Sequence, residues 1–237
     1  MMDTYFTAPG AWDGGEFGIS MFLGRVDPRY AREFLSALWT LPHIEGCWLD
    51  KTKEPDEASR LRPTDIDLDD PPRPGGALFG LVELPNGCRC PCASFVMDDD
   101  DGFWVEFSMP IVSLGRCYPV GAYPFDDGSD LTWVGELSEW LADIGRGLYA
   151  EKPLMAAVVG HVTMVENRAV LEIISGEVPS KRWDGYLLPE GAELKWYAPN
   201  VSSAPWTDIR PLRRSFWARF SGALRSKWTK RGHEIQK

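Results

Sequence analysis

The sequence predicts an α+β fold in which two or three helices cover a mainly antiparallel β-sheet. Several short runs alternate apolar and polar residues, which is typical of strands with one packed face. Longer segments repeat apolar residues at helical spacing instead. An Asp-Gly pair joins two of the strand-like runs, as it does in many β-hairpins. With 237 residues, 44% of them hydrophobic and 11 of them Trp, the chain has enough apolar material for a core.

The first elements are a strand, a helix and a second strand. Residues 17–23 alternate in polarity and predict the strand. Asp27 then suits a helix N-cap, and Pro28 suits the first helical position, where its missing N–H donor is not needed. Apolar residues repeat at helical spacing over 28–41, and residues 44–49 predict a short strand.

Residues 50–76 interrupt this pattern. They hold five prolines and a group of aspartates without any periodicity, so we expect a long exposed loop. Strands follow at 77–84, 90–97 and 103–109, and the last two form a hairpin across an Asp-rich turn that ends at Gly102. In the last strand, Glu106 lies on the face opposite the alternating apolar residues, which predicts a sheet with one packed face.

The second half repeats this order in outline. An apolar stripe predicts a helix over 131–148, whose end is marked by Gly145 and Gly147. A hairpin (154–164 and 169–175) and two short strands (183–188 and 193–197) follow. Two similar α+β halves, 1–125 and 126–208, are therefore conceivable, although no residue-level repeat supports them.

Charge divides the chain into an acidic body, 1–208, and a basic tail, 209–237. The tail holds nine Lys or Arg and one Glu, a charge of +8, and the net charge of −10 leaves −18 on the body. Apolar residues recur at helical spacing over 213–229, which predicts a third, basic amphipathic helix. We expect the tail to dock on the acidic body. The alternative is binding to an anionic membrane or nucleic acid, through Arg214, Trp217, Arg225 and Trp228.

The expected location is the cytoplasm. No run of about 18 apolar residues is present, and the first residues lack the basic and apolar regions of a secretory signal. Five cysteines are an odd number, so we expect reduced thiols.

Known catalytic fingerprints are absent. The sequence holds no phosphate-binding P-loop, no dinucleotide-binding glycine motif, no HExxH and no GxSxG. His43 and His161 are the histidines available to acid–base catalysis outside the tail, but a structural role is the simpler interpretation. We therefore favour a protein that is not an enzyme, and no cofactor is predicted.

One cysteine cluster is a candidate metal site. Alternate residues of an extended chain project to the same side, so the sulfurs of Cys88, Cys90 and Cys92 could converge on a zinc ion, with Cys47 or Cys117 as a fourth ligand. The C-x-C-x-C spacing is not a standard zinc signature, and buried free thiols are the simpler interpretation.

Two kinds of acidic residue are candidate sites. The hairpin tip could bind a basic protein partner, although solvated acids at a turn are the simpler interpretation; its residues are Asp98, Asp99, Asp100 and Asp101. The strand carboxylates Glu83, Glu106 and Glu172 could pair as acid and base on the sheet. For these three, a solvated sheet face is the favoured interpretation.

The favoured function is a protein-binding module that masks a basic partner. The negative charge of the acidic body disfavours nucleic acid as its partner and favours a basic protein. Bacterial immunity proteins share this physical character, without any sequence match. One alternative is an enzyme or small-molecule binder with a site assembled from distant residues. Another is association with a membrane surface or nucleic acid through the tail.

Overall fold

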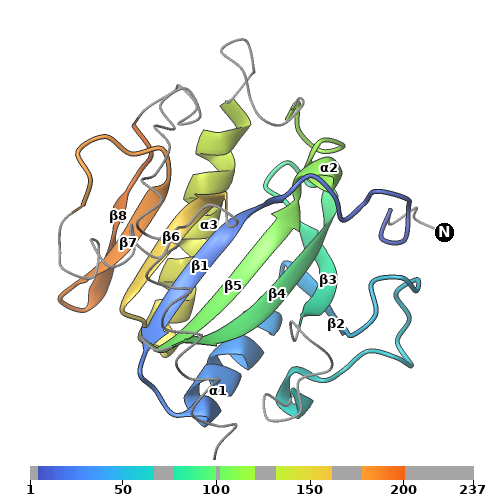
Figure 1. Ribbon diagram of the computed structural model, residues 1–237, viewed down its shortest axis with the longest axis horizontal. Coiled ribbons are helices and arrows are strands. Elements are labelled where there is room, and N and C mark those ends of the chain that lie inside the picture. Colours follow the sequence, from blue (N-terminus) through green and yellow to red (C-terminus); the bar gives the residue numbers. More distant parts are fainter. Residues whose placement is uncertain (1–4, 67–76, 100–101, 121–131, 162–177, 201–237) are drawn as a thin grey trace, which may run out of the picture. The chain divides into compact units, whose positions relative to one another are not determined.

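The computed structural model confirms the α+β fold: the residues that it describes form one eight-stranded antiparallel sheet with the strand order β2-β3-β4-β5-β1-β6-β7-β8 (Figure 1). It describes residues 5–66, 77–99, 102–120, 132–161 and 178–200. The strands are β1 (Glu16–Gly24), β2 (Ile44–Trp48), β3 (Leu78–Glu83), β4 (Arg89–Asp99), β5 (Gly102–Pro110), β6 (Ala156–His161), β7 (Gly185–Glu190) and β8 (Glu193–Tyr197). The helices are α1 (Pro28–Trp39), α2 (Ile111–Leu114) and α3 (Thr132–Glu151), with a 3₁₀ turn, η1 (Pro63–Asp65).

Helix α1 begins as its sequence predicts. The Asp27 side chain accepts a hydrogen bond from the Arg29 backbone N–H at 2.8 Å, and Pro28 is the first helical residue. The apolar stripe of the helix is buried against the sheet. Its last residue, Trp39, donates from its indole Nε1 to Ser94 Oγ on β4 at 2.8 Å, so even the polar atom of this buried ring is satisfied.

Helix α3 runs past its predicted end. Gly145 and Gly147 indicated a stop, but the helix continues to Glu151. Gly145 has a packing role: a Cβ there would lie 2.6 Å from Leu187 Cδ1 on β7 and 3.1 Å from Ile19 Cδ1 on β1. The missing side chain therefore lets the helix lie close to the sheet.

The centre of the sheet is β1, which pairs with β5 on one side and β6 on the other. The predicted hairpin is confirmed as β4–β5, with Asp99 opposite Gly102. Gly102 has a φ of +137°, and a Cβ there would overlap the Gly24 carbonyl, so this turn requires glycine. Since β5, β1 and β6 are neighbours, residues on both sides of position 125 share one sheet.

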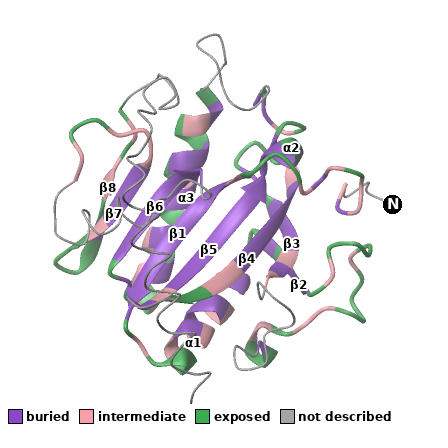
Figure 2. Cartoon of the chain, in the orientation of Figure 1, coloured by how far each residue is buried: buried purple, intermediate pink, exposed green. Residues whose placement is uncertain are grey.

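The two faces of the sheet differ in what covers them. Helices α1 and α3 lie on one face, the helix face, where the main core gathers. The second face, toward the viewer in Figure 1, carries no helix longer than one turn among the described residues. Its central side chains are nevertheless buried, as the purple strands β1 and β5 in Figure 2 show. The sequence-based expectation of a single packed face is therefore wrong for the central strands.

The N-terminal segment covers part of the second face near β2 and β3. Phe6 packs edge-on against Trp12 and Trp48, with ring centroids 5.2 and 6.0 Å apart. Trp12 in turn meets Phe79 of β3 edge-on at 5.1 Å. These rings form a small apolar cluster separate from the main core.

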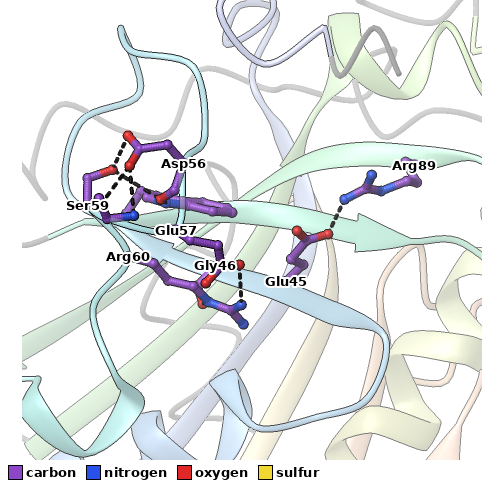
Figure 3. A network of polar contacts seen from close by, with 9 residues as sticks. Glu45, Gly46, Asp56, Glu57, Ser59, Arg60 and Arg89 are labelled. Carbon is purple, nitrogen blue, oxygen red and sulfur yellow. Dashed lines mark hydrogen bonds and ion pairs between the residues drawn. The ribbon is translucent and has the colours of Figure 1, made fainter. Parts of the chain in front are cut away.

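Strand β2 lies at one edge of the sheet, and the loop after it pairs with this edge (Figure 3). Arg60 Nε donates to the Gly46 carbonyl at 2.8 Å, and the Leu61 N–H donates to the Cys47 carbonyl at 2.9 Å. The loop itself is fixed by Asp56, which accepts hydrogen bonds from Ser59. These bonds occupy backbone acceptors that an edge strand otherwise exposes.

Several predicted elements lie partly or wholly outside the described residues. These are the later part of the loop (67–76), the strand at 169–175 and the tail helix at 213–229. Residues 50–66 form a loop, as expected, apart from the single turn η1. The division into an acidic body and a basic tail stays a prediction. The short helix α2 was not predicted, since four residues carry no periodic signal.

Candidate functional site

Polar side chains cross the centre of the second face on neighbouring strands. Glu106 on β5 lies opposite Ser20 on β1 in the sheet register, and Ser20 lies opposite Val158 on β6. One step along the strands, Ser108 lies opposite Gly18. These register positions follow from the antiparallel pairing, because residues two apart on a strand project from the same face.

Glu106 is the most unusual side chain on this face. It is 6% exposed, and its Oε2 atom is buried without a hydrogen-bond partner. Ser20, opposite it, is 1% exposed, and its hydroxyl also lacks a hydrogen bond of normal geometry. A buried polar atom without a partner loses its hydration and gains nothing in return, so such atoms are rare in folded proteins.

The surroundings of Glu106 favour its protonated form. Burial raises its pKa to about 8; the nearby Ser20 hydroxyl opposes this shift, and the negative charge of Glu16 adds to it. The carboxyl is therefore mostly neutral at pH 7 and is poised to ionise when a positive charge approaches.

A second carboxylate lies close by. Glu16 begins β1 and accepts a hydrogen bond from the Ser108 hydroxyl at 2.7 Å. Glu16, Ser20, Glu106 and Ser108 thus form one cluster on two adjacent strands, which we name the carboxyl site. Two carboxyl groups and two hydroxyls can bind a cation, or can exchange a proton with a bound molecule.

An aromatic patch adjoins the carboxyl site on the same face. Phe22 and Trp104, the next residues along β1 and β5, are paired with ring centroids 4.6 Å apart and planes tilted by 32°. They belong to a buried apolar cluster on β1, β5, β6 and β7, with Ala156, Val158 and Tyr186. The second face therefore changes from acidic to aromatic within two register positions.

Another carboxyl with a raised pKa lies nearby at the start of β7. The Asp184 carboxyl packs against Gly160, where a Cβ would overlap it. Burial raises its pKa to about 7, and a hydrogen bond from the His161 backbone opposes the shift. Gly18 and Gly160 on β1 and β6 lie between Asp184 and the carboxyl site, so we treat Asp184 as a separate group.

Of the three strand carboxylates predicted as an acid–base set, the structure buries one. Glu106 was expected on a solvated face, and this expectation is wrong. Glu83 is exposed at the end of β3, where its backbone N–H donates to the His43 carbonyl. Glu172 lies outside the described residues. The second carboxylate near Glu106 is instead Glu16, which no strand alternation singled out.

The two candidate histidines lie in different surroundings. His43 is exposed beside β2. His161 is buried at the end of β6, where its ring meets Phe17 edge-on at 5.3 Å. Burial lowers the pKa of His161 to about 4, so its ring is neutral at pH 7 and packs as part of the core.

The predicted cysteine cluster separates into two groups. Cys88 forms a disulfide with Cys117, with a Cα–Cα distance of 5.7 Å, in contrast to the expectation of reduced thiols. The turn between β3 and β4 and the end of α2 bring these two residues together; Asn86, in that turn, bonds both backbones. Cys90 and Cys92 are buried in the main core, as is Cys47.

The described residues hold no group of three or more His, Cys, Asp or Glu side chains placed to bind a metal. The zinc site at Cys88, Cys90 and Cys92 stays a prediction. Asp98 is exposed at the end of β4, while Asp100 and Asp101 lie outside the described residues. The tail residues Arg214, Trp217, Arg225 and Trp228 also lie outside them.

Comparisons with known proteins add no name to this site. No protein-family model matches the chain, and neither the curated proteins nor the solved structures give a match. In the part of the chain that the structure describes, no helix has the length and apolar character needed to cross a membrane.

Proposed function

We propose that the protein binds a positively charged ligand at the carboxyl site. The observation that carries this proposal is the buried Oε2 atom of Glu106, which has no hydrogen-bond partner. A cation that reaches this atom would supply the missing contact and would favour the ionised carboxylate. The negative charge of Glu16 and of the acidic body adds a long-range attraction for such a ligand.

The site is assembled from distant residues, since Glu16 and Glu106 are ninety positions apart in the sequence and lie on the paired strands β1 and β5. This supports the sequence-based alternative of a small-molecule binder. Because Ser20 and Glu106 are buried, a ligand reaches them only when their surroundings open. We therefore expect association well below the diffusion limit.

The test is a calorimetric titration of the full chain with two ammonium probes, methylamine and benzylamine, and with benzyl alcohol as an uncharged analogue. We expect at least one amine to bind, and Glu106→Gln to weaken that binding roughly tenfold or more, because a charge-assisted hydrogen bond is lost. Glu83→Gln is the matched control, since it removes an exposed strand carboxylate, and it should change nothing. Equal binding of the alcohol, or unchanged binding in Glu106→Gln, contradicts the proposal.

A second candidate function is the masking of a basic protein partner. It is favoured by the charge of −18 on residues 1–208 and by exposed acids on α3. Glu136 is exposed there, whereas Glu139 and Asp143 share Arg146.

Affinity capture from the native host at low and moderate salt tests this candidate. A stoichiometric basic protein that added salt releases, and that an Asn replacement of Asp98–Asp101 weakens, supports it; no specific protein at either salt contradicts it.

A further inference from the structure

A lysine ammonium group lies over two aromatic rings near β2 and β3. The distance from Lys51 Nζ is 5.6 Å to the centroid of the Trp12 ring and 5.8 Å to that of the Phe79 ring. The two rings meet edge-on, with planes at 77° and centroids 5.1 Å apart, so they form two walls that we name the aromatic corner. Both distances lie within the roughly 6 Å over which a ring face attracts a cation.

The two walls of the aromatic corner are held in place from outside it. Trp12 donates from its indole Nε1 to the Phe6 carbonyl at 2.8 Å and packs edge-on against the buried Phe6 ring. Phe79 lies on β3, opposite Trp48 of β2 and Ala93 of β4. Both walls are nevertheless partly exposed. The corner is therefore formed in advance and is open to solvent.

The present occupant of the corner is held by the rings. Lys51 is an exposed residue of the loop that follows β2. None of the ion pairs that the described residues form includes it; in this loop they join Lys53 to Asp50 and Arg60 to Glu57. The lysine side chain is a flexible four-carbon stem, so its ammonium group can leave without movement of the backbone. Lys51 thus shows which chemical group the corner accepts, and a ligand can displace it.

We propose that the aromatic corner is a second cation site, which takes the quaternary ammonium group of a small molecule in competition with Lys51. A quaternary ammonium has no N–H donors and therefore needs no hydrogen-bond acceptor, whereas the primary ammonium of lysine is strongly hydrated. Aromatic walls are a general means of recognising such groups. The natural chain binds the ligand less tightly than the open corner does, by the fraction of molecules in which Lys51 has left.

This site differs from the carboxyl site in what it requires of its ligand. At the carboxyl site a buried acid must lose its proton, and the ligand pairs with the resulting charge. The aromatic corner offers ring faces that are already exposed, and no proton is released on binding. The net charge of −10 on the chain attracts cations to both sites.

The test is a calorimetric titration of the full chain with choline and with dimethylbutanol, its uncharged analogue in which carbon replaces the nitrogen. We expect Lys51→Ala to bind choline roughly threefold to tenfold more tightly than the natural chain, because the competitor is gone. Lys53→Ala is the matched control: it removes the same charge from the same loop but leaves the corner occupied, so it should bind choline nearly as the natural chain does. Dimethylbutanol should bind each protein more weakly than choline.

The walls are tested by a second substitution. Trp12→Leu, added to Lys51→Ala, should remove most of the gain in choline affinity, since one ring face is lost. Retention of the full gain would overturn the assignment to the corner. Because Lys51 and Lys53 are exposed loop residues, their comparison decides the proposal even if the Trp12→Leu variant does not fold.

The other outcomes that overturn the proposal are distinct from one another. Equal gains in Lys51→Ala and Lys53→Ala would show an effect of charge alone. Equal binding of dimethylbutanol would show an apolar site without cation recognition. Absence of choline binding to folded Lys51→Ala would leave Lys51 with a structural role. Loss of choline binding when Glu106→Gln is added to Lys51→Ala would place the ligand at the carboxyl site, which overturns this inference and leaves the proposed function in place.

Discussion

Glu106 on β5 lies directly opposite Ser20 on β1, and each carries a buried oxygen without a hydrogen-bond partner. The two strands are in the centre of the sheet, where both faces are buried. An unpaired acid at such a position costs stability in its ionised form. The charge of Glu106 therefore depends on whether a positively charged group lies close to it.

The first prediction concerns the free energy of unfolding above neutral pH. Because burial raises the pKa of Glu106 to about 8, the native state holds this proton after the unfolded chain has lost it. Stability therefore falls as pH rises from the unfolded pKa toward 8. Between pH 7 and pH 8 we expect a loss of roughly 1 kcal/mol in urea unfolding, and Glu106→Gln should remove it.

This pH window isolates Glu106 from the other buried groups. Asp184, with a pKa of about 7, changes stability in the same direction but mainly below pH 7. His161, with a pKa lowered to about 4, acts with the opposite sign between that value and its unfolded pKa near 6.5. A Glu106→Gln variant that retains the full slope between pH 7 and pH 8 would show that another group titrates there.

The second prediction concerns the disulfide. Cys88 and Cys117 are 29 positions apart, so their bond restricts a long loop of the unfolded chain. Reduction with dithiothreitol should lower the free energy of unfolding by roughly 2–4 kcal/mol. The double variant Cys88→Ala/Cys117→Ala should start from the lower value and should not respond to the reductant. A response of this variant equal to that of the natural chain would contradict the assignment.

The third prediction concerns the three buried thiols. Burial raises the pKa of Cys47 to about 12, and it also raises the pKa of Cys90 and Cys92. The unreactive thiol form therefore dominates at neutral pH. An aromatic disulfide reagent should find no reactive thiol in the native oxidised chain and three after denaturation. Rapid reaction in the native state, or protection by added zinc, would contradict a purely packed role for these residues.

The fourth prediction compares two glycines. At Gly80 on β3, a Cβ would lie 2.6 Å from the Glu45 carbonyl oxygen and 2.5 Å from the Trp39 ring. Gly80→Ala should therefore destabilise the fold by roughly 1–3 kcal/mol. Gly147, exposed on α3 with nothing within 4 Å of such a Cβ, is the matched control. Gly147→Ala should stabilise by roughly 0.5–1 kcal/mol, since alanine favours the helix. Equal effects in thermal unfolding would contradict the close packing of Trp39 on Gly80.

Much of the fold could be predicted from local patterns. Helix α1 has an N-cap, a proline at its start and a complete apolar stripe, and its predicted start is confirmed. The β4–β5 hairpin follows from the Asp-Gly turn between alternating strands. The end of α3 was predicted too early, because Gly145 is required by its contact with Leu187 on β7. Such a contact between distant elements leaves no local signal.

The candidate site could be predicted only in part. Glu106 appears in the sequence as the polar residue of an alternating strand, which is typical of a solvated face. Its burial depends on the central place of β5 in the sheet, and strand order is not encoded in local periodicity. The placement of Glu16 and Ser20 near Glu106 depends on the same long-range pairing of β1 with β5. The disulfide likewise joins two cysteines that no spacing rule connects.

The most direct test of the central claim is the number of protons released when an amine binds. Benzylamine is titrated calorimetrically at pH 7 in buffers of different ionisation enthalpy, with the natural chain and with Glu106→Gln. If the cation pairs with Glu106, the natural chain should release close to one proton per bound ligand, because the carboxyl must ionise. The variant should bind more weakly and release none. Binding of equal strength in both proteins, without proton release, would contradict the account.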